Sequence, residues 1–352
     1  MTGSSTRRAA DAGSANDPLL PALPRHVQFE VTGACNLRCR MCLVRYQPPI
    51  NKIQGSLPFE LFRRVVDAIP GLRKITLQGL GEPLLAPDLF AMIEYVKPRG
   101  IRMGFNTNAT LLTRDRAERL VDGQLSWLHF SLDGATASTF EGVRDGASFD
   151  RVRRNIEGLV EVMRERGTRT PRLELVFVAM RRNVHELADV VRLAGAWGIG
   201  KVWVQNLSHS FSDTEPAGRF SEIRSFAAAE ALWNGNGHGD GGAARAFAEA
   251  RHAAEEVGVT LRLPEREEGA GPRQEGEPGC WWPFGETYIT HDGKVLPCCM
   301  VMGPERATLG DLNVEDFPSI WHGPAYRDFR RALLSARPPE VCEGCSLYRG
   351  VF

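Results

Sequence analysis

The sequence predicts an α/β fold: a partial (β/α)6 TIM-like barrel followed by a small cysteine-rich module. Six short apolar runs alternate with amphipathic stretches between residues 26 and 207. Five of the eight cysteines lie at or beyond Cys280, and none lies between Cys42 and Cys280. Strands that alternate with helices build a parallel sheet with right-handed crossovers. Six such units, where a full barrel has eight, predict an incomplete barrel.

The strands are predicted from runs of β-branched and aromatic residues, and the helices from apolar residues that recur at helical spacing. The predicted strands are 26–32, 74–79, 102–108, 127–133, 173–180 and 201–207, with a further strand at 259–264. The predicted helices are 58–69, 149–167 and 243–258. Because barrels place their chemistry at the C-terminal ends of the strands, polar residues that follow these runs are the candidates for a site.

Composition divides the chain into three predicted parts. Residues 1–25 are rich in Ser, Gly, Ala and Asp and are predicted to be a disordered tail. The barrel is predicted to span 26–264, with a Ser-, Gly- and Asn-rich linker at 208–242. The C-terminal module is predicted to span 265–352, and it opens with a Gly- and Pro-rich stretch.

The overall charge and hydropathy exclude two classes of partner. The chain has 43 basic and 43 acidic residues, so it lacks the basic excess of a nucleic-acid binder. It contains no apolar run near the roughly 20 residues that a membrane span needs, and its N-terminus lacks the apolar core of a secretory signal. We therefore expect a cytoplasmic protein that binds neither nucleic acid nor membrane.

The first cysteine group follows the first predicted strand. Three residues separate Cys35 from Cys39, and two separate Cys39 from Cys42. A short loop with three thiolates can hold a [4Fe–4S] cluster and leave its fourth iron without a protein ligand. An open coordination position is what a metal needs to bind a small molecule. The alternatives are three structural cysteines or a zinc-binding loop.

This motif and the strand ends that follow it resemble the radical S-adenosylmethionine (SAM) superfamily, over about residues 26–350. The resemblance implies that the open iron binds SAM and that reductive cleavage gives a 5′-deoxyadenosyl radical, which abstracts a substrate hydrogen. A flavodoxin- or ferredoxin-type reductant is implied as a partner. The chain departs from the family at Met41, where an aromatic residue is usual, although a Met can also pack against adenine.

The resemblance also implies SAM contacts at the ends of the second, third and fourth strands. Glu82 is expected to accept a bond from the methionyl ammonium, the nearby glycines to admit the ligand, and Arg144 to face the SAM carboxylate. For each polar residue the alternative is a role in a turn or cap. The expected SAM-binding residues are Met41, Gly79, Gly81, Glu82, Asn106, Asn108, Ser131, Asp133 and Arg144.

The C-terminal module carries a second group of cysteines. Asp292-Gly293 predicts a hairpin turn, and Cys298 follows Gly293 by five positions. This pattern and the terminal Cys-x2-Cys resemble the SPASM/Twitch auxiliary-cluster domains. The resemblance implies a second [4Fe–4S] cluster, and a zinc ribbon is the alternative. Its expected ligands are Cys280, Cys298, Cys342 and Cys345.

One cysteine of the module is left over. Neighbouring residues on a strand face opposite ways, so Cys298 and Cys299 are not expected to bind the same cluster. Cys299 is a candidate donor of a hydrogen atom to a substrate radical. The alternatives are an inert buried thiol, or that Cys299 is the ligand and Cys298 is the spare residue.

The resemblance to the Twitch type implies a small hydroxylated substrate such as a sugar, nucleoside or aminocyclitol. The spare Cys299 favours epimerisation, in which a thiol quenches the substrate radical. Three alternatives stay open: dehydrogenation of an alcohol to a ketone, maturation of a peptide, and a non-enzymatic electron carrier.

Overall fold

The computed structural model describes residues 17–46, 55–207, 209–232, 241–264 and 279–350. These residues form one sheet of ten strands in the order β10-β9-β8-β1-β2-β3-β4-β5-β6-β7. The strands from β1 to β7 are parallel, which confirms the predicted α/β class and all six predicted barrel strands. Their bounds are β1 His26–Phe29, β2 Lys74–Leu77, β3 Arg102–Thr107, β4 Trp127–Ser131, β5 Arg172–Val178, β6 Lys201–Gln205 and β7 Thr260–Arg262.

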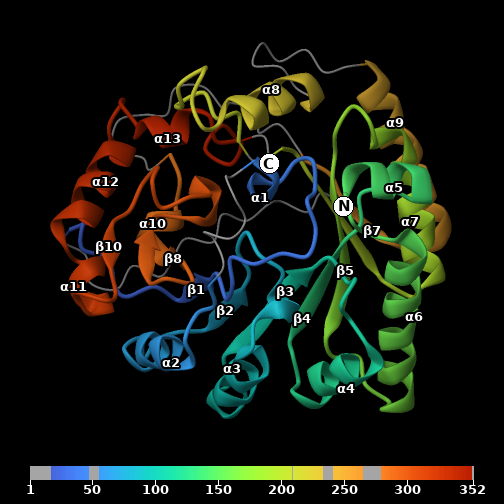
Figure 1. Ribbon diagram of the computed structural model, residues 1–352, viewed down its shortest axis with the longest axis horizontal. Helices are drawn as coiled ribbons and strands as arrows, with labels where there is room; N and C mark the ends of the chain where they lie inside the picture. The colour runs from blue at the N-terminus through green and yellow to red at the C-terminus, as the bar shows by residue number, and fades with distance from the viewer. Residues whose placement is uncertain (1–16, 47–54, 208, 233–240, 265–278, 351–352) are drawn as a thin grey trace.

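The helices between the strands pack their apolar stripes against one face of the sheet (Figure 1). In α6 the buried residues are Phe149, Val152, Ile156, Leu159 and Val162, which recur at the helical period. This confirms the helix predicted at 149–167. The helices of this layer are α2 Phe59–Asp67, α3 Leu89–Val96, α4 Arg114–Asp122, α5 Ala137–Val143, α6 Phe149–Glu165, α7 Leu187–Ala196 and α9 Gly241–Val257.

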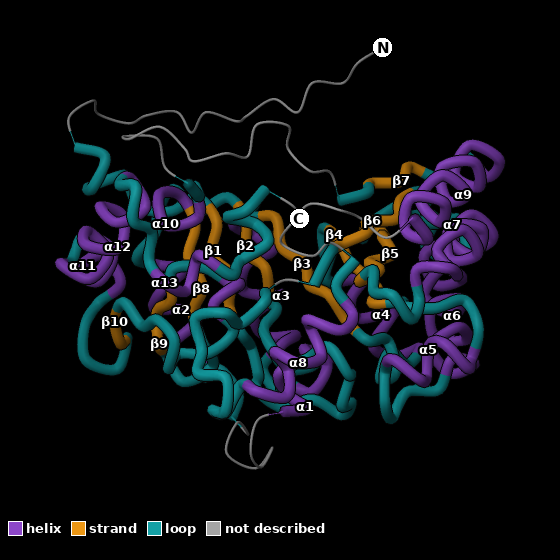
Figure 2. Tube along the Cα trace, turned by 90° about the horizontal axis from the view of Figure 1, so that it is seen from above, coloured by secondary structure: helices purple, strands orange, loops and turns teal. Residues whose placement is uncertain are grey.

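The strands have one apolar face and one polar face. In β6, Val202 and Val204 are fully buried in the core, whereas the alternating Lys201 and Gln205 are only partly buried. Successive side chains of a strand point to opposite faces, so the second set lies away from the helices. We call this second face the inner face. Figure 2 shows the strands from β8 to β7 following an open arc.

The C-terminal module continues the barrel sheet. Strand β8 (Glu286–Ile289) pairs in parallel with β1, and β9 (Lys294–Leu296) pairs antiparallel with β8. The predicted hairpin is confirmed, and Gly293 takes a φ of +88° in its turn. The remaining elements are β10 Gly310–Asp311, α10 Trp282–Gly285, α11 Phe317–Trp321, α12 Pro324–Leu334 and α13 Glu340–Glu343.

Two sequence predictions about irregular segments were wrong in part. Residues 17–25 of the predicted tail pack on the C-terminal module, where the Leu19 carbonyl accepts a bond from buried Arg330 at 2.9 Å. The predicted linker contains α8 (Ser221–Glu230), whose Ala-rich sequence buries Ile223 and Ala227. Composition alone did not predict the order of either segment, because tertiary contacts hold them in place. Residues 1–16, 208, 233–240 and most of the stretch opening the module (265–278) lie outside the described residues.

The helices of the described segments are too short or too polar to cross a membrane.

Gly104 in β3 provides a test of the sheet packing. A Cβ added there would lie 2.3 Å from the Trp127 carbonyl oxygen and 2.4 Å from its indole. We expect Gly104→Ala to destabilise the holoenzyme by about 1–3 kcal/mol through overpacking. Gly158 is the matched control, because it lies within α6 and a Cβ there meets nothing within 4 Å. Gly158→Ala should stabilise the protein by roughly 0.5–1 kcal/mol. Equal denaturation midpoints for the two variants would contradict this account.

Candidate active site and cluster sites

The loop that carries Cys35, Cys39 and Cys42 is held on both sides by backbone hydrogen bonds. The Ala34 carbonyl accepts from Glu82 N–H at 2.8 Å, and Arg40 N–H donates to the Val143 carbonyl at 2.9 Å. These bonds tie the loop to the end of β2 and to the end of α5. The loop therefore keeps its place over the C-terminal ends of the strands.

The three thiols of this loop lie close enough to influence each other. Burial raises the pKa of Cys35 to about 11 and the pKa of Cys42 to about 12, and the charge of Cys39 adds to both shifts. Burial also raises the pKa of Cys39, which the cationic Arg144 opposes. Thiols that are hard to ionise alone but lie together are suited to binding a metal, because the metal replaces the proton. The structure thus brings together the three cysteines that the sequence predicted.

Arg144 and Asp133 form a buried ion pair beside this loop. Arg144 Nη2 lies 2.7 Å from Asp133 Oδ2, and Arg144 Nη1 lies 3.8 Å from Cys39 Sγ. Asp133 also accepts from Val178 N–H at 2.7 Å. Arg144 Nε, which is buried, has no hydrogen-bond partner within the described protein. The pair places a cation next to the cysteine loop, with one donor left over for a ligand.

Glu82 is buried and already accepts three hydrogen bonds. Its donors are Thr107 Oγ1 at 2.6 Å, Asn108 N–H at 2.8 Å and Leu84 N–H at 3.2 Å. Burial raises the pKa of Glu82, while these bonds oppose the shift. A carboxylate offers about four lone-pair sites, so one remains for a further donor. Asn108 joins the same network and donates to Asn36 Oδ1 at 3.1 Å.

The two glycines before Glu82 have a packing role that the sequence analysis did not predict. A Cβ at Gly79 would lie 2.2 Å from Glu30 Cγ, and a Cβ at Gly81 would lie 2.1 Å from the Thr32 carbonyl oxygen. The glycines therefore leave room for the residues that follow β1. The predicted contact of these glycines with SAM stays a prediction.

Glu30 links three parts of the molecule. It is 4% exposed and accepts from Leu80 N–H at 2.9 Å, from the Tyr288 hydroxyl at 2.8 Å and from His291 Nδ1 at 2.7 Å. Leu80 belongs to the turn that carries Glu82, and the other two residues belong to the C-terminal hairpin. The sequence analysis missed Glu30, although a carboxylate within an otherwise buried strand end is a signal that could have found it.

A row of polar residues crosses the inner face below Glu82. Asn106, His129 and Glu174 are neighbours in the register of β3, β4 and β5. Asn106 Oδ1 lies 3.0 Å from His129 Nδ1, and Glu174 Oε2 lies 3.6 Å from His129 Nε2 and 2.8 Å from Lys201 Nζ. We call these four residues the inner-face row. Of them the sequence analysis identified Asn106 alone. The predicted Ser131 is partly buried at the end of β4, and Met41 is partly buried beside Cys42.

The cysteines of the C-terminal module form a second group. Burial raises the pKa of Cys298 well above its usual range, and the charges of the four other module cysteines add to the shift. The pKa of Cys342 is raised by burial and by the charges of Cys280 and Cys345. The module cysteines, which come from three separate segments, thus lie close enough to influence one another. All eight cysteines of the chain are described, and none forms a disulfide.

Cys299 lies close to the same thiols as Cys298, since Cys345 and Cys280 act on its pKa, but Glu286 acts on it more strongly. Burial raises the pKa of Cys299 to about 12, and the next largest effect is the charge of Glu286. Cys299 in turn affects the pKa of Lys74. Lys74 and Glu286 begin β2 and β8, so Cys299 lies toward the N-terminal ends of these strands.

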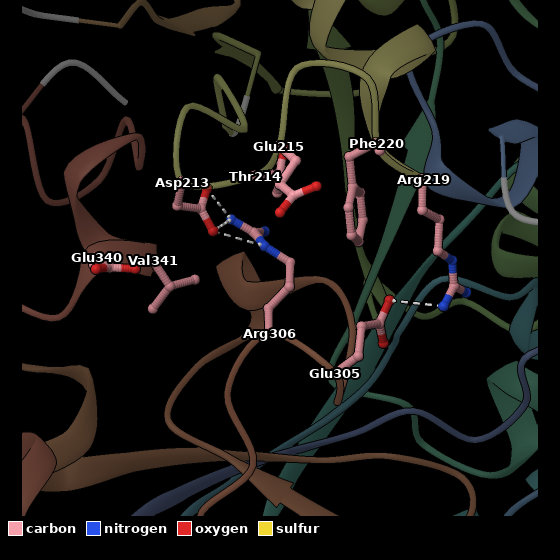
Figure 3. A pocket seen from close by; sticks show the side chains of 10 residues that line it. Asp213, Thr214, Glu215, Arg219, Phe220, Glu305, Arg306, Glu340 and Val341 are labelled. Carbon is pink, nitrogen blue, oxygen red and sulfur yellow. Dashed lines mark hydrogen bonds and ion pairs between the residues drawn. The ribbon is translucent and has the colours of Figure 1, made fainter.

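A polar pocket of about 400 Å³ lies beside the second cysteine group (Figure 3). Within it Arg306 pairs with Asp213 at 2.7 Å, and Arg219 pairs with Glu305 at 3.5 Å. Val341, which precedes Cys342, lines the same pocket. The pocket therefore opens next to a cysteine-bearing segment, and its charged walls are largely paired.

His209 bonds the segment that carries Val341 and Cys342. Its Nδ1 accepts from Phe211 N–H at 2.8 Å, so its proton lies on Nε2 and is donated to the Val341 carbonyl at 2.8 Å. Burial and then the charge of Arg306 lower the pKa of His209 to about 4, which keeps the imidazole neutral. His209 also forms a β-bridge with Cys345.

The residue types present suit iron–sulfur clusters: three thiols lie in one loop, and further thiols lie in the C-terminal module. In the described part of the chain, no group of three or more His, Cys, Asp or Glu side chains is arranged around one metal ion.

Two family models match the chain. A model described as radical SAM superfamily matches residues 29–194, and a model described as an iron-sulfur cluster-binding domain, SPASM, matches residues 280–346. The first match covers the strands and the loop that position Cys35, Cys39, Cys42, Glu82 and Arg144. The second covers the five cysteines of the C-terminal module.

Three curated proteins are similar to parts or most of the chain. A tungsten-containing aldehyde ferredoxin oxidoreductase cofactor-modifying protein from Pyrococcus furiosus is 28% identical over 52% of this chain and 51% of its own length. An AdoMet-dependent heme synthase from Nitratidesulfovibrio vulgaris is 24% identical over 91% of this chain and 86% of its own. The mycofactocin maturase MftC from Mycobacterium tuberculosis is 28% identical over 50% of this chain and 43% of its own. The chain thus spans about half the length of the first of these relatives.

Among solved structures, SuiB from Streptococcus suis, bound to the precursor peptide SuiA, has a similar fold. The TM-score is 0.66 at 15% identity, and the match covers 94% of this chain and 72% of that one. The two family models, rather than the likeness of fold, imply [4Fe–4S] clusters and SAM as cofactors, and the two groups of thiols suit them. The chain belongs to the radical SAM superfamily, in the subgroup that carries a C-terminal SPASM domain.

Proposed function

We propose that the protein is a radical SAM maturase that abstracts a hydrogen atom from a C–H bond of a peptide. The observation that carries this proposal is the similarity to the mycofactocin maturase, which extends over half of this chain. The likeness of fold to SuiB, a protein solved with its precursor peptide, is consistent with it. The relatives named above give no support to the sugar, nucleoside or aminocyclitol substrate that the sequence analysis favoured.

We propose that Cys35, Cys39 and Cys42 hold the catalytic cluster, which supplies the electron that cleaves SAM when both are bound. Glu82 keeps one acceptor position for the methionyl ammonium, and Arg144 keeps a donor for the carboxylate. Asn108 holds Asn36, the residue after Cys35, and thereby fixes the loop. Asp133 orients Arg144 through their ion pair. These side chains bind and orient the cofactor.

We propose that Cys280, Cys298, Cys342 and Cys345 hold the auxiliary cluster. Cys298 is assigned as the ligand because, after burial, the charges of the other module cysteines are the largest effects on its pKa, whereas for Cys299 the charge of Glu286 comes first. Cys299 is then a packing residue. Barrel chemistry takes place at the C-terminal strand ends, and Cys299 lies toward the opposite ends of β2 and β8. A strand of four residues spans about 13 Å, which leaves Cys299 poorly placed to donate a hydrogen atom. Epimerisation thereby loses its main support.

A second candidate is modification of a tetrapyrrole. The AdoMet-dependent heme synthase aligns over 91% of this chain, so the similarity includes the C-terminal module. The maturase alignment covers half of the chain and leaves the rest unmatched. The two candidates share cofactor chemistry and differ in the substrate.

Changing Cys35, Cys39 and Cys42 together to Ala tests the catalytic cluster. Anaerobically reconstituted protein should hold about eight irons, and the triple variant about four, because one of two [4Fe–4S] clusters is lost. The variant should form no 5′-deoxyadenosine with SAM and dithionite. Iron analysis and chromatography measure these outcomes, and cleavage of SAM by the variant would refute the assignment.

Single substitutions distinguish Cys298 from Cys299. Cys298→Ala should lose the auxiliary cluster, about four irons, because a ligand is removed. Cys299→Ala is the matched control and should keep all its iron and its turnover. If Cys299→Ala lost iron while Cys298→Ala kept it, the two assignments would have to be exchanged. Full iron with no turnover in Cys299→Ala would restore its role as a donor.

The substrate class is tested by following the abstracted hydrogen. The holoenzyme is incubated with SAM, a reductant and a carbon-deuterated short peptide encoded beside its gene. If the peptide is the substrate, deuterium should appear in 5′-deoxyadenosine, as measured by mass spectrometry. An iron porphyrin that carries free carboxylates is the parallel probe. Deuterium transfer from a labelled porphyrin, with none from the peptide, would favour the second candidate.

A further inference from the structure

The inner-face row is continuous and ordered across four strands. Asn106, His129 and Glu174 lie side by side in register, and Lys201 closes the row through its 2.8 Å bond to Glu174. The alternate residues of the same strands, such as Leu128 and Val202, are fully buried under the helices. The row is therefore a fixed feature of the sheet, held by pairing on each side.

The row remains partly accessible. The exposed fraction of the side chain is 14% for His129, 15% for Glu174 and 35% for Lys201. One side-chain repeat further along, Trp203 on β6 is partly buried, and the Arg262 guanidinium lies 4.6 Å from its ring centroid. A polar row that solvent still reaches, next to an aromatic residue and a cation, has the composition of a ligand-binding surface.

The largest charge effects on the pKa of His129 come from one carboxylate and three cations. Glu174 raises this pKa, whereas Lys201, Lys74 and Arg172 lower it; Lys74 is itself near Glu286. Burial and these cations lower the pKa of His129 to about 4, so the imidazole itself adds no charge near neutral pH. Arg262 adds a further positive charge beside Trp203. An anionic group on this face would offset the excess of positive charge.

The row lies directly below the residues proposed to bind SAM. Asn108, whose N–H donates to Glu82, lies two positions after Asn106 and just beyond the end of β3. Residues two apart on a strand share a face and are separated by about 7 Å. A substrate group held by the row therefore lies one side-chain repeat from the Glu82 network.

We propose that the inner-face row, with Trp203 and Arg262, binds a carboxylate group of the substrate. Lys201 and Arg262 supply the charge, and the Asn106 amide N–H supplies a hydrogen bond. The neutral His129 donates its one N–H to Asn106 Oδ1 and so orients that amide. Glu174 holds Lys201 in place and, as a like charge, weakens the binding. This inference rests on the proposed function and names the substrate chemistry that this face selects: an acidic side chain or a free C-terminus of a peptide, or a carboxylate of a porphyrin.

Matched probes test this proposal without turnover. The SAM-loaded holoenzyme is titrated anaerobically, by calorimetry, with N-acetyl-glutamate N-methylamide and with its glutamine counterpart. N-acetylglycine and N-acetylglycinamide form a second pair, which represents a free C-terminus. We expect the carboxylate of at least one pair to bind roughly tenfold or more tightly than its amide, as for hydrogen bonds to charged groups. The pair that discriminates identifies the source of the carboxylate.

Substitutions in the row should act in opposite directions. Lys201→Met should abolish the preference for the carboxylate, whereas Glu174→Gln should strengthen it, because a repelling charge is removed. Lys201→Met alone leaves the Glu174 carboxylate without its partner, which could disturb folding. The double variant Glu174→Gln/Lys201→Met removes both charges of the pair and therefore avoids this problem. It should bind both probes of a pair equally. Lys97→Met is the control and should behave as the parent, since Lys97 is exposed on the outer side and bonds the Asp122 carbonyl.

Two outcomes would overturn the site. One is equal affinity of the parent for carboxylate and amide in both pairs, and the other is a preference that survives in the double variant. Failure of the proposed function looks different: neither the peptide nor the porphyrin would transfer deuterium, while the probes would still bind in the order given. Conversion of a peptide without discrimination between the probes would refute the carboxylate site alone.

Discussion

The structure depends on the double pairing of β1. This strand pairs in parallel with β2 on one side and with β8 on the other, so the barrel and the C-terminal module share one sheet. Glu30, just beyond the end of β1, accepts bonds from the turn after β2 and from the hairpin after β8. Cys35, the first cysteine of the loop, lies five residues later. A single strand end therefore positions the cysteine loop, the turn that carries Glu82 and the C-terminal module relative to one another.

This arrangement explains how two cluster sites form from a chain that separates its cysteines widely. The first three lie in one loop and need local hydrogen bonds alone. The other group comes from three segments, and tertiary pairing collects them. The β8–β9 hairpin presents Cys298, His209 bonds the Val341 carbonyl, and Arg306 bonds the Val301 carbonyl and pairs with Asp213. A neutral histidine and a paired arginine thus lie near these thiols, where nearby charge and hydrogen bonding would set the potential of a bound cluster.

The two faces of the sheet differ in composition and in role. The outer face supplies the apolar core under the helices, and the inner face carries polar residues whose charges are only partly balanced. A maturase and a tetrapyrrole-modifying enzyme can share the SAM-binding ends of the strands, because that chemistry belongs to the cofactor. Substrate choice then rests on the inner face, where the row from Asn106 to Lys201 lies.

The sequence by itself determined the parallel α/β class, the six barrel strands, the terminal hairpin and the grouping of the cysteines, because strand periodicity and Cys spacing are local properties. It also singled out Glu82 and Asp133 at strand ends, and Arg144 from the family resemblance, as candidate site residues. Only the tertiary structure decided that residues 17–25 and 221–230 are ordered, that Gly79 and Gly81 make room for Glu30 and Thr32, and which charges act most strongly on Cys298 and on Cys299. The inner-face row and the Glu30 network join residues from strands far apart in the chain, and no local pattern encodes which side chains meet across a sheet.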